Sequence, residues 1–143
     1  MCGIIGVSGL VNQVKLQKGV RLLSHRGPDD TGIFIDEELG VGLGHTRLAI
    51  QDLSSAGHQP MSDTSGNIII VFNGEIYNFN ELKVELEDKG YYFNGNSDTE
   101  VLVNLYIEFG KEMFARLNGI FALAIWDKRN ASLLIARDAL GVK

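Results

Sequence analysis

The residue best suited to chemistry is Cys2, the one cysteine in the 143-residue sequence. A start methionine that precedes a small residue is commonly excised, and Cys2 would then carry both a thiol and a free α-amino group. Such an amine titrates near neutral pH and can take the thiol proton, which is how an N-terminal nucleophile is activated. The alternative is that Cys2 is a small buried hydrophobe. If Met1 stays attached, the nitrogen of Cys2 is a peptide amide, and we expect no activity.

A nucleophile of this kind needs donors for the oxyanion that forms when it attacks a carbonyl. Asn73-Gly74 follows an apolar run, and the Asn amide together with the Gly backbone N–H would suit that role. The alternative is a plain Asn-Gly turn, because this pair is also a strong hairpin signal.

Two charged residues could hold a small substrate. Arg47 ends a predicted strand, and its guanidinium could bind a carboxylate through two parallel hydrogen bonds, although it could also be a surface arginine. Asp98 could bind an ammonium group, but a carboxylate in the first turn of a helix is favoured by the helix dipole as well. Both alternatives stay open from these residues alone.

Several function classes are disfavoured. The three histidines and one cysteine have no metal-ligand spacing, and the sequence holds neither a dinucleotide-binding nor a P-loop glycine pattern. A net charge of −5 without a basic cluster argues against nucleic acid. No segment has the length of a membrane span or the form of a signal peptide. A lone cysteine fits a reducing compartment, so we expect a cytoplasmic protein.

Hydrophobic periodicity predicts an α+β domain with antiparallel sheet. A capping box at residues 97–100 starts one helix, which ends at Gly110. The other predicted helices cover residues 14–24, 80–89 and 111–117. The predicted strands cover residues 4–7, 32–35, 41–45, 68–72, 121–126 and 132–136.

Taken together, the motifs resemble the class II, N-terminal-nucleophile glutamine amidotransferase domains, of the asparagine synthetase type. The resemblance covers the whole chain and rests on six ordered segments after the initial Met-Cys-Gly: HRGPDDTG, GHTRLAIQDLSSAGHQPM, FNGEIYN, SDTEV, LNGIFALAIWD and ARDALGVK. It implies the fold of the N-terminal-nucleophile hydrolases, a four-layer α-β-β-α sandwich with antiparallel sheets.

The resemblance also implies roles for individual residues. Cys2 would attack the side-chain amide of glutamine, form a γ-glutamyl thioester and yield glutamate and ammonia. Asn73 and Gly74 would form the oxyanion hole. The residues expected to bind glutamine are Arg47, Ile50, Gln51, Glu75 and Asp98. Arg26, Asp29 and Arg137-Asp138 also match the family motifs, and we interpret these residues as architectural.

The expected domain is a type 2 glutamine amidotransferase domain over residues 1–143. Related domains continue for several more strands, so this one is expected to be incomplete at its C-terminus. Exposed strand edges would then favour a homodimer. The synthetase domain, normally in the same chain, would bind ATP and Mg and use the ammonia on an acceptor, with aspartate expected. No cofactor or metal is expected in residues 1–143. The alternatives are another class II amidotransferase with a different acceptor, and a non-catalytic module that binds glutamine.

Overall fold

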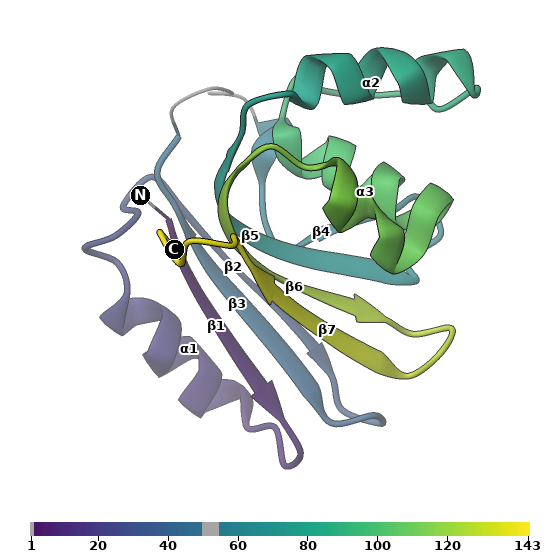
Figure 1. Ribbon diagram of the computed structural model, residues 1–143. Helices are drawn as coiled ribbons and strands as arrows, with labels where there is room; N and C mark the ends of the chain where they lie inside the picture. Colours follow the sequence, from purple (N-terminus) through teal and green to yellow (C-terminus); the bar gives the residue numbers. More distant parts are fainter. Residues whose placement is uncertain (1, 50–54) are drawn as a thin grey trace.

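The computed structural model describes residues 2–49 and 55–143, and in it two antiparallel sheets lie face to face between helices. Figure 1 shows the layers, with helix α1 (Gln13–Leu22) outside the first sheet and helices α2 (Phe79–Asp88) and α3 (Asp98–Phe109) outside the second. This order is the four-layer α-β-β-α arrangement expected from the sequence. No helix in the described part of the chain has the length and apolar character that crossing a membrane requires.

The first sheet has the strand order β1-β3-β2 and carries the N-terminus. Its strands are β1 (Gly3–Ser8), β2 (Asp30–Asp36) and β3 (Val41–Arg47), and β3 is buried along its whole length. Helix α1 (Gln13–Leu22) covers the outer face through Leu16 and Val20. Because β1 and β3 are antiparallel, Gly3 pairs with Thr46, which brings Cys2 to the end of β3 that carries Arg47.

The second sheet has the order β4-β5-β6-β7. Its strands are β4 (Met61–Ser62), β5 (Ile68–Ile76), β6 (Gly119–Asp127) and β7 (Ser132–Arg137). Its outer face is covered by α2 (Phe79–Asp88) and α3 (Asp98–Phe109), and two short 3-10 helices, η1 (Ser55–Gly57) and η2 (Gly110–Arg116), complete the elements.

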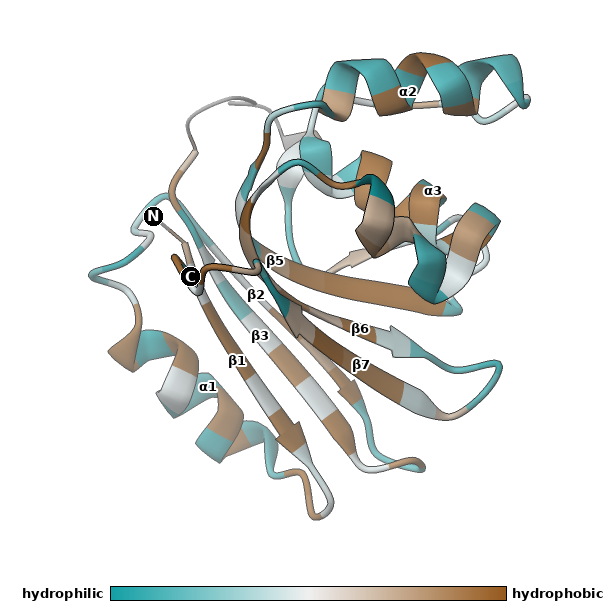
Figure 2. Cartoon of the chain, in the orientation of Figure 1, coloured by the Kyte–Doolittle hydropathy of each residue, from teal (hydrophilic) through white to brown (hydrophobic). Residues whose placement is uncertain are grey.

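Strand β5 is buried on both faces because its side chains alternate between two cores. Ile68, Ile70 and Phe72 pack toward α2 and α3, whereas Ile69 and Val71 pack between the sheets. Trp126 of β6 also lies between the sheets and donates from Nε1 to Asp36 Oδ2 of β2 at 3.1 Å. The apolar colouring along β5 in Figure 2 reflects this double burial.

The main difference from the sequence-based elements is the length of β5. The prediction ended this strand at residue 72, but the pairing with β6 continues through Asn73↔Ala122 and Gly74↔Phe121 to Ile76. Asn73-Gly74 therefore lies within a strand, and the alternative of a plain Asn-Gly turn is wrong. Gly74 is required here because an added Cβ would clash with Ile120 O and lie 2.7 Å from the Cα of Phe121.

One half of the predicted capping box forms at the N-terminus of α3. Ser97 Oγ accepts from the backbone N–H of Glu100 at 3.2 Å. The Glu100 carboxylate accepts instead from the N–H groups of Asn94 and Gly95, at 2.8 and 2.9 Å, so it fixes the preceding loop. Both contacts hold Asp98, the first residue of the helix, in a defined place.

The contact between α1 and the first sheet depends on glycine in β3. A Cβ added at Gly44 would clash with Val20 Cγ2 and lie 2.8 Å from Ile5 Cγ2. We expect Gly44→Ala to lower the free energy of unfolding by about 1–3 kcal/mol, measured by urea denaturation. The control is Gly6→Ala in β1, where the nearest atom lies at 3.6 Å, which is ordinary contact. Equal stability of the two variants would contradict this packing.

Candidate active site

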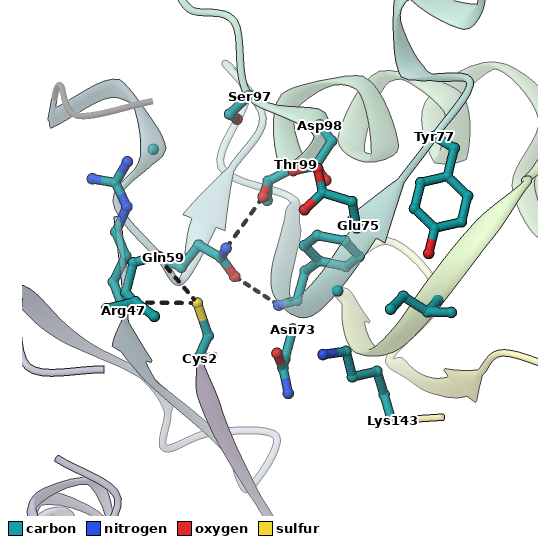
Figure 3. A pocket seen from close by; sticks show the side chains of 15 residues that line it. Cys2, Arg47, Gln59, Asn73, Glu75, Tyr77, Ser97, Asp98, Thr99 and Lys143 are labelled. Atoms are coloured by element: carbon teal, nitrogen blue, oxygen red, sulfur yellow. Dashed lines mark hydrogen bonds between the residues drawn. The ribbon is translucent and has the colours of Figure 1, made fainter. Parts of the chain in front are cut away.

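A cavity of about 290 Å³ opens where the two sheets and the start of α3 meet. Figure 3 shows Cys2 and Arg47 entering it from the first sheet, and Asn73 and Glu75 entering from β5 of the second. Asp98 and Thr99 come from the first turn of α3. The structure thus brings together all the predicted site residues that it describes; Ile50 and Gln51, like Met1, lie outside the described residues.

Cys2 is half-buried, and its sulfur contacts the backbone of one residue, Leu48. The Leu48 N–H donates to Sγ at 3.5 Å, and the thiol lies 3.9 Å from the Leu48 carbonyl oxygen. The next residue is fixed as well, because the Gly3 N–H donates to Thr46 Oγ1 at 3.1 Å and that hydroxyl donates to Leu23 O. The thiol is therefore not buried in the core and faces the cavity.

Arg47 is nearly buried, with 9% of its surface exposed, so it is not a surface arginine. Its guanidinium packs against Gly57 of η1, where any added Cβ would clash with Nη2. The backbone of Arg47 contacts the HRGPDDTG segment. The Asp29 N–H donates to the Arg47 carbonyl at 3.0 Å, and Gly27 packs against the backbone of Thr46 and Arg47. Asp29 thus has the architectural role expected for it, and Gly27, which was not singled out from the sequence, shares that role.

Three N–H groups of β5 point away from β6, toward the cavity edge of the strand. Antiparallel pairs alternate between bonded and non-bonded residues. Phe121, opposite Gly74, directs its N–H and carbonyl to Asp138 instead, so Gly74 belongs to a non-bonded pair. The N–H of Phe72 donates to Gln59 Oε1 at 2.6 Å, and that of Ile76 donates to Asp98 Oδ2 at 3.3 Å. The N–H of Gly74, between them, faces the cavity.

The carboxylate of Asp98 is 8% exposed, and burial raises its pKa to about 6. The neighbouring negative charge of Glu75 contributes to this rise in the pKa, while the hydrogen bond from Ile76 opposes it. Two carboxylates so close together in a buried site favour a bound cation. The described residues contain no group of three acidic, His or Cys side chains arranged for a metal ion.

The comparisons with known proteins agree with this geometry. The family model described as "Glutamine amidotransferase domain" matches residues 1–143. The chain belongs to this family. Asparagine synthetase [glutamine-hydrolyzing] 1 of Bacillus subtilis is 45% identical over 100% of the chain, and amidase chry2 of Gibberella zeae is 42% identical over 90% of it. The chain spans 23% and 19% of the length of these two relatives.

The fold of the family is confirmed by a solved structure. The glutamine phosphoribosylpyrophosphate amidotransferase of B. subtilis, solved with ADP and GMP, superposes with a TM-score of 0.80. The superposition covers 100% of this chain and 38% of that one, at 24% sequence identity. Such a likeness establishes the N-terminal-nucleophile amidotransferase fold that the motifs predicted.

Within this amidotransferase domain, sequence reasoning missed the residues that support the site. Gln59 lies in the quoted GHQPM segment but was not singled out, and Thr99 was noticed only as part of a helix cap. His45 was weighed only as a metal ligand, yet its Nε2 lies 3.1 Å from the carbonyl oxygen of Phe72. A polar residue that becomes fully buried leaves no mark in a sequence, because its partner is distant along the chain.

His45 provides a test of this buried network. Because a carbonyl only accepts, Nε2 must carry the proton, and burial lowers the pKa of His45 to about 4. Below about pH 6.5 the unfolded chain binds a proton at His45, whereas the folded chain does so only near pH 4. The free energy of unfolding therefore falls as the pH drops from 6.5 toward 4, by about 3 kcal/mol over the whole range.

We expect urea unfolding to show a larger loss of stability between pH 7 and pH 4.5 for the parent chain than for His45→Gln, whose amide can donate to the same carbonyl without titrating. Asp98, whose raised pKa acts in the opposite sense over this range, is present in both chains and cancels in the comparison. Equal losses in the two chains would show that His45 is not held neutral.

Proposed function

We propose that this domain hydrolyses glutamine to glutamate and ammonia at Cys2. The observation that carries the proposal is the arrangement of groups around one cavity. The thiol of Cys2, next to the N-terminus, lies there together with the cavity edge of β5, a cationic side chain and two carboxylates. Figure 3 shows Arg47 on one side of the cavity and Glu75 with Asp98 on the other. A free α-amino acid carries one carboxylate and one ammonium, and this arrangement is complementary to both.

In the proposed reaction the Cys2 sulfur attacks the side-chain amide carbon, and the α-amino group of Cys2 takes the thiol proton. The carbonyl oxygen becomes an oxyanion between the Asn73 amide and the Gly74 N–H. Such preorganised donors each stabilise the transition state by about 3 kcal/mol. The carbon–nitrogen bond then breaks, the α-amino group returns the proton to the leaving ammonia, and water hydrolyses the thioester.

Glutamine is held by its other end. Arg47 binds the α-carboxylate with its guanidinium, and Asp98 with Glu75 receives the α-ammonium group. Ile50 and Gln51, outside the described residues, complete the pocket. The proposal needs no cofactor in this domain.

The ammonia is proposed to serve an asparagine synthetase reaction. A synthetase domain in the same polypeptide would activate aspartate with ATP and Mg and accept the ammonia. The support is the 45% identity to a glutamine-hydrolysing asparagine synthetase, together with the small part of that relative which this chain spans. A different acceptor is the second candidate, favoured by the 42% identity to a relative named as an amidase.

The assignment of Cys2 is tested by Cys2→Ala. We expect ammonia release from glutamine to fall by about three orders of magnitude or more, because the covalent step is lost. Isothermal calorimetry should still show glutamine binding. Undiminished ammonia release by Cys2→Ala would exclude Cys2 as nucleophile.

The same measurement separates an enzyme from a non-catalytic module. The parent sample must have Met1 removed, as checked by mass spectrometry, because an acylated Cys2 nitrogen cannot act as base. Glutamine binding without ammonia release from the correctly processed chain would favour the non-catalytic alternative.

The role of Asp98 predicts a pH dependence. As the pH falls through about 6, Asp98 becomes neutral in the free protein and the α-ammonium loses a charge partner, so KM for glutamine should rise on acidification. Asp98→Asn should raise KM about tenfold to a hundredfold at pH 7.5 and weaken its rise below pH 6. The control is Asp88→Asn at the exposed end of α2. An unchanged KM in Asp98→Asn would contradict the ammonium site.

A further inference from the structure

We propose that Gln59 is a positioning residue for the oxyanion site, which it ties to the first turn of α3. The inference rests on the proposed function and adds a residue whose side chain acts through β5. Gln59 is 5% exposed and lies just before β4, so its amide is in the protein interior rather than at the mouth of the cavity.

The need for such a residue comes from where β4 stops. Along the outer edge of β5, β4 pairs only with Ile69 and Ile70. The next residue of β5 that directs its backbone groups to this edge is Phe72, and no strand reaches it there. A buried backbone N–H without a partner costs about 1–3 kcal/mol. The Gln59 amide replaces the absent strand, since Oε1 accepts from the Phe72 N–H at 2.6 Å.

The other end of the same amide reaches a different element. Gln59 Nε2 donates to Thr99 Oγ1 at 3.2 Å, in the first turn of α3 next to Asp98. Figure 3 shows both hydrogen bonds, with Gln59 lying between β5 and α3 behind Cys2. Helix α3 is firmly packed, with Leu102 and Leu105 fully buried. Core packing and the Ile76–Asp98 hydrogen bond already join β5 to this helix, and Gln59 adds a link at Phe72 that helps to set the position of the strand.

This position matters because Phe72 directly precedes the oxyanion donors. The Asn73 amide and the Gly74 N–H belong to the part of β5 beyond β4. Among the described residues, no strand pairs with the outer edge of this part, and Asp98 accepts from the Ile76 N–H farther along it. Among the described residues, His45 binds the carbonyl of Phe72 from the first sheet, and Gln59 connects the Phe72 N–H by hydrogen bonds to the helix that carries Asp98. Misplacement of catalytic donors by about 1 Å can lower a rate a hundredfold.

The step that depends most on this alignment is formation of the tetrahedral intermediate. Ground-state binding of glutamine relies on Arg47, Glu75 and Asp98 instead. Loss of Gln59 should therefore lower kcat much more than it weakens glutamine binding. A purely structural role would instead lower stability and leave the kcat of the folded protein unchanged.

The test uses Gln59→Leu, which removes both hydrogen bonds at similar volume, with Gln13→Leu at an exposed position of α1 as the matched control. Under conditions where urea unfolding shows both to be folded, Gln59→Leu should lower kcat for ammonia release about 10- to 100-fold. Its glutamine Kd, measured in a Cys2→Ala background, should change by less than about threefold. Equal kcat values for the two variants would overturn the proposal.

A second pair of variants keeps the proposal testable if Gln59→Leu does not fold. Thr99→Val preserves the Gln59–Phe72 bond and removes only the link to α3, so it should also lower kcat, whereas Thr99→Ser, which keeps the hydroxyl, should recover most of the loss. If Thr99→Val has the kcat of the parent chain, the link to α3 does not position the site.

Failure of the proposed function would be distinguishable from failure of this inference. If the processed parent chain releases no ammonia, the activity is wrong, and amide hydrogen exchange still decides the role of Gln59. Exchange at Phe72, whose N–H donates to Gln59, should be about tenfold faster in Gln59→Leu than in Gln13→Leu, and faster in Thr99→Val as well. Unchanged exchange would show that Gln59 does not hold this edge.

Discussion

The site depends on the hydrogen bonds made along the outer edge of β5, beyond the point where β4 ends. A strand buried on both faces cannot leave these backbone groups without partners. Side chains from β3, α3 and the loop before β4 satisfy them, with Gln59 and His45 at Phe72 and Asp98 at Ile76. Between these two points the N–H of Gly74 faces the cavity. The same arrangement that stabilises the strand therefore presents one donor for chemistry.

The cavity also requires close approach of the two sheets, because the proposed nucleophile and the proposed oxyanion donors belong to different ones. Cys2 lies on the first sheet and Asn73 on the second. Glycines allow close packing around the cavity: Gly27 against the end of β3, Gly57 against the Arg47 guanidinium and Gly74 against the neighbouring strand β6. A domain with one sheet could not surround a small substrate with these groups.

The electrostatics of the site follow from burial. Arg47 and the pair of Glu75 and Asp98 are charged groups held in a partly buried cavity, and a zwitterion placed between them would neutralise both ends. Burial lowers the pKa of His45, which therefore stays neutral and adds a donor without adding charge. Neutral residues beneath the cavity thus support β5, while the charged residues around the cavity have the proposed role of binding the substrate.

The sequence by itself determined the helices and the strands other than the short β4, the layer order through its family motifs, and the residues with reactive or charged groups. Cys2 was recognisable from its position, and Ser97 from the capping pattern that starts α3, because both signals are local. Only the tertiary structure decided that Asn73-Gly74 belongs to a strand, since a local Asn-Gly signal was outweighed by nine residues of pairing with β6. It also decided the roles of Gln59, Thr99 and His45, whose partners are 27–40 residues away along the chain or, for the Gln59–Phe72 bond, 13. Such contacts exist only after the sheets and α3 have packed, so no local pattern records them.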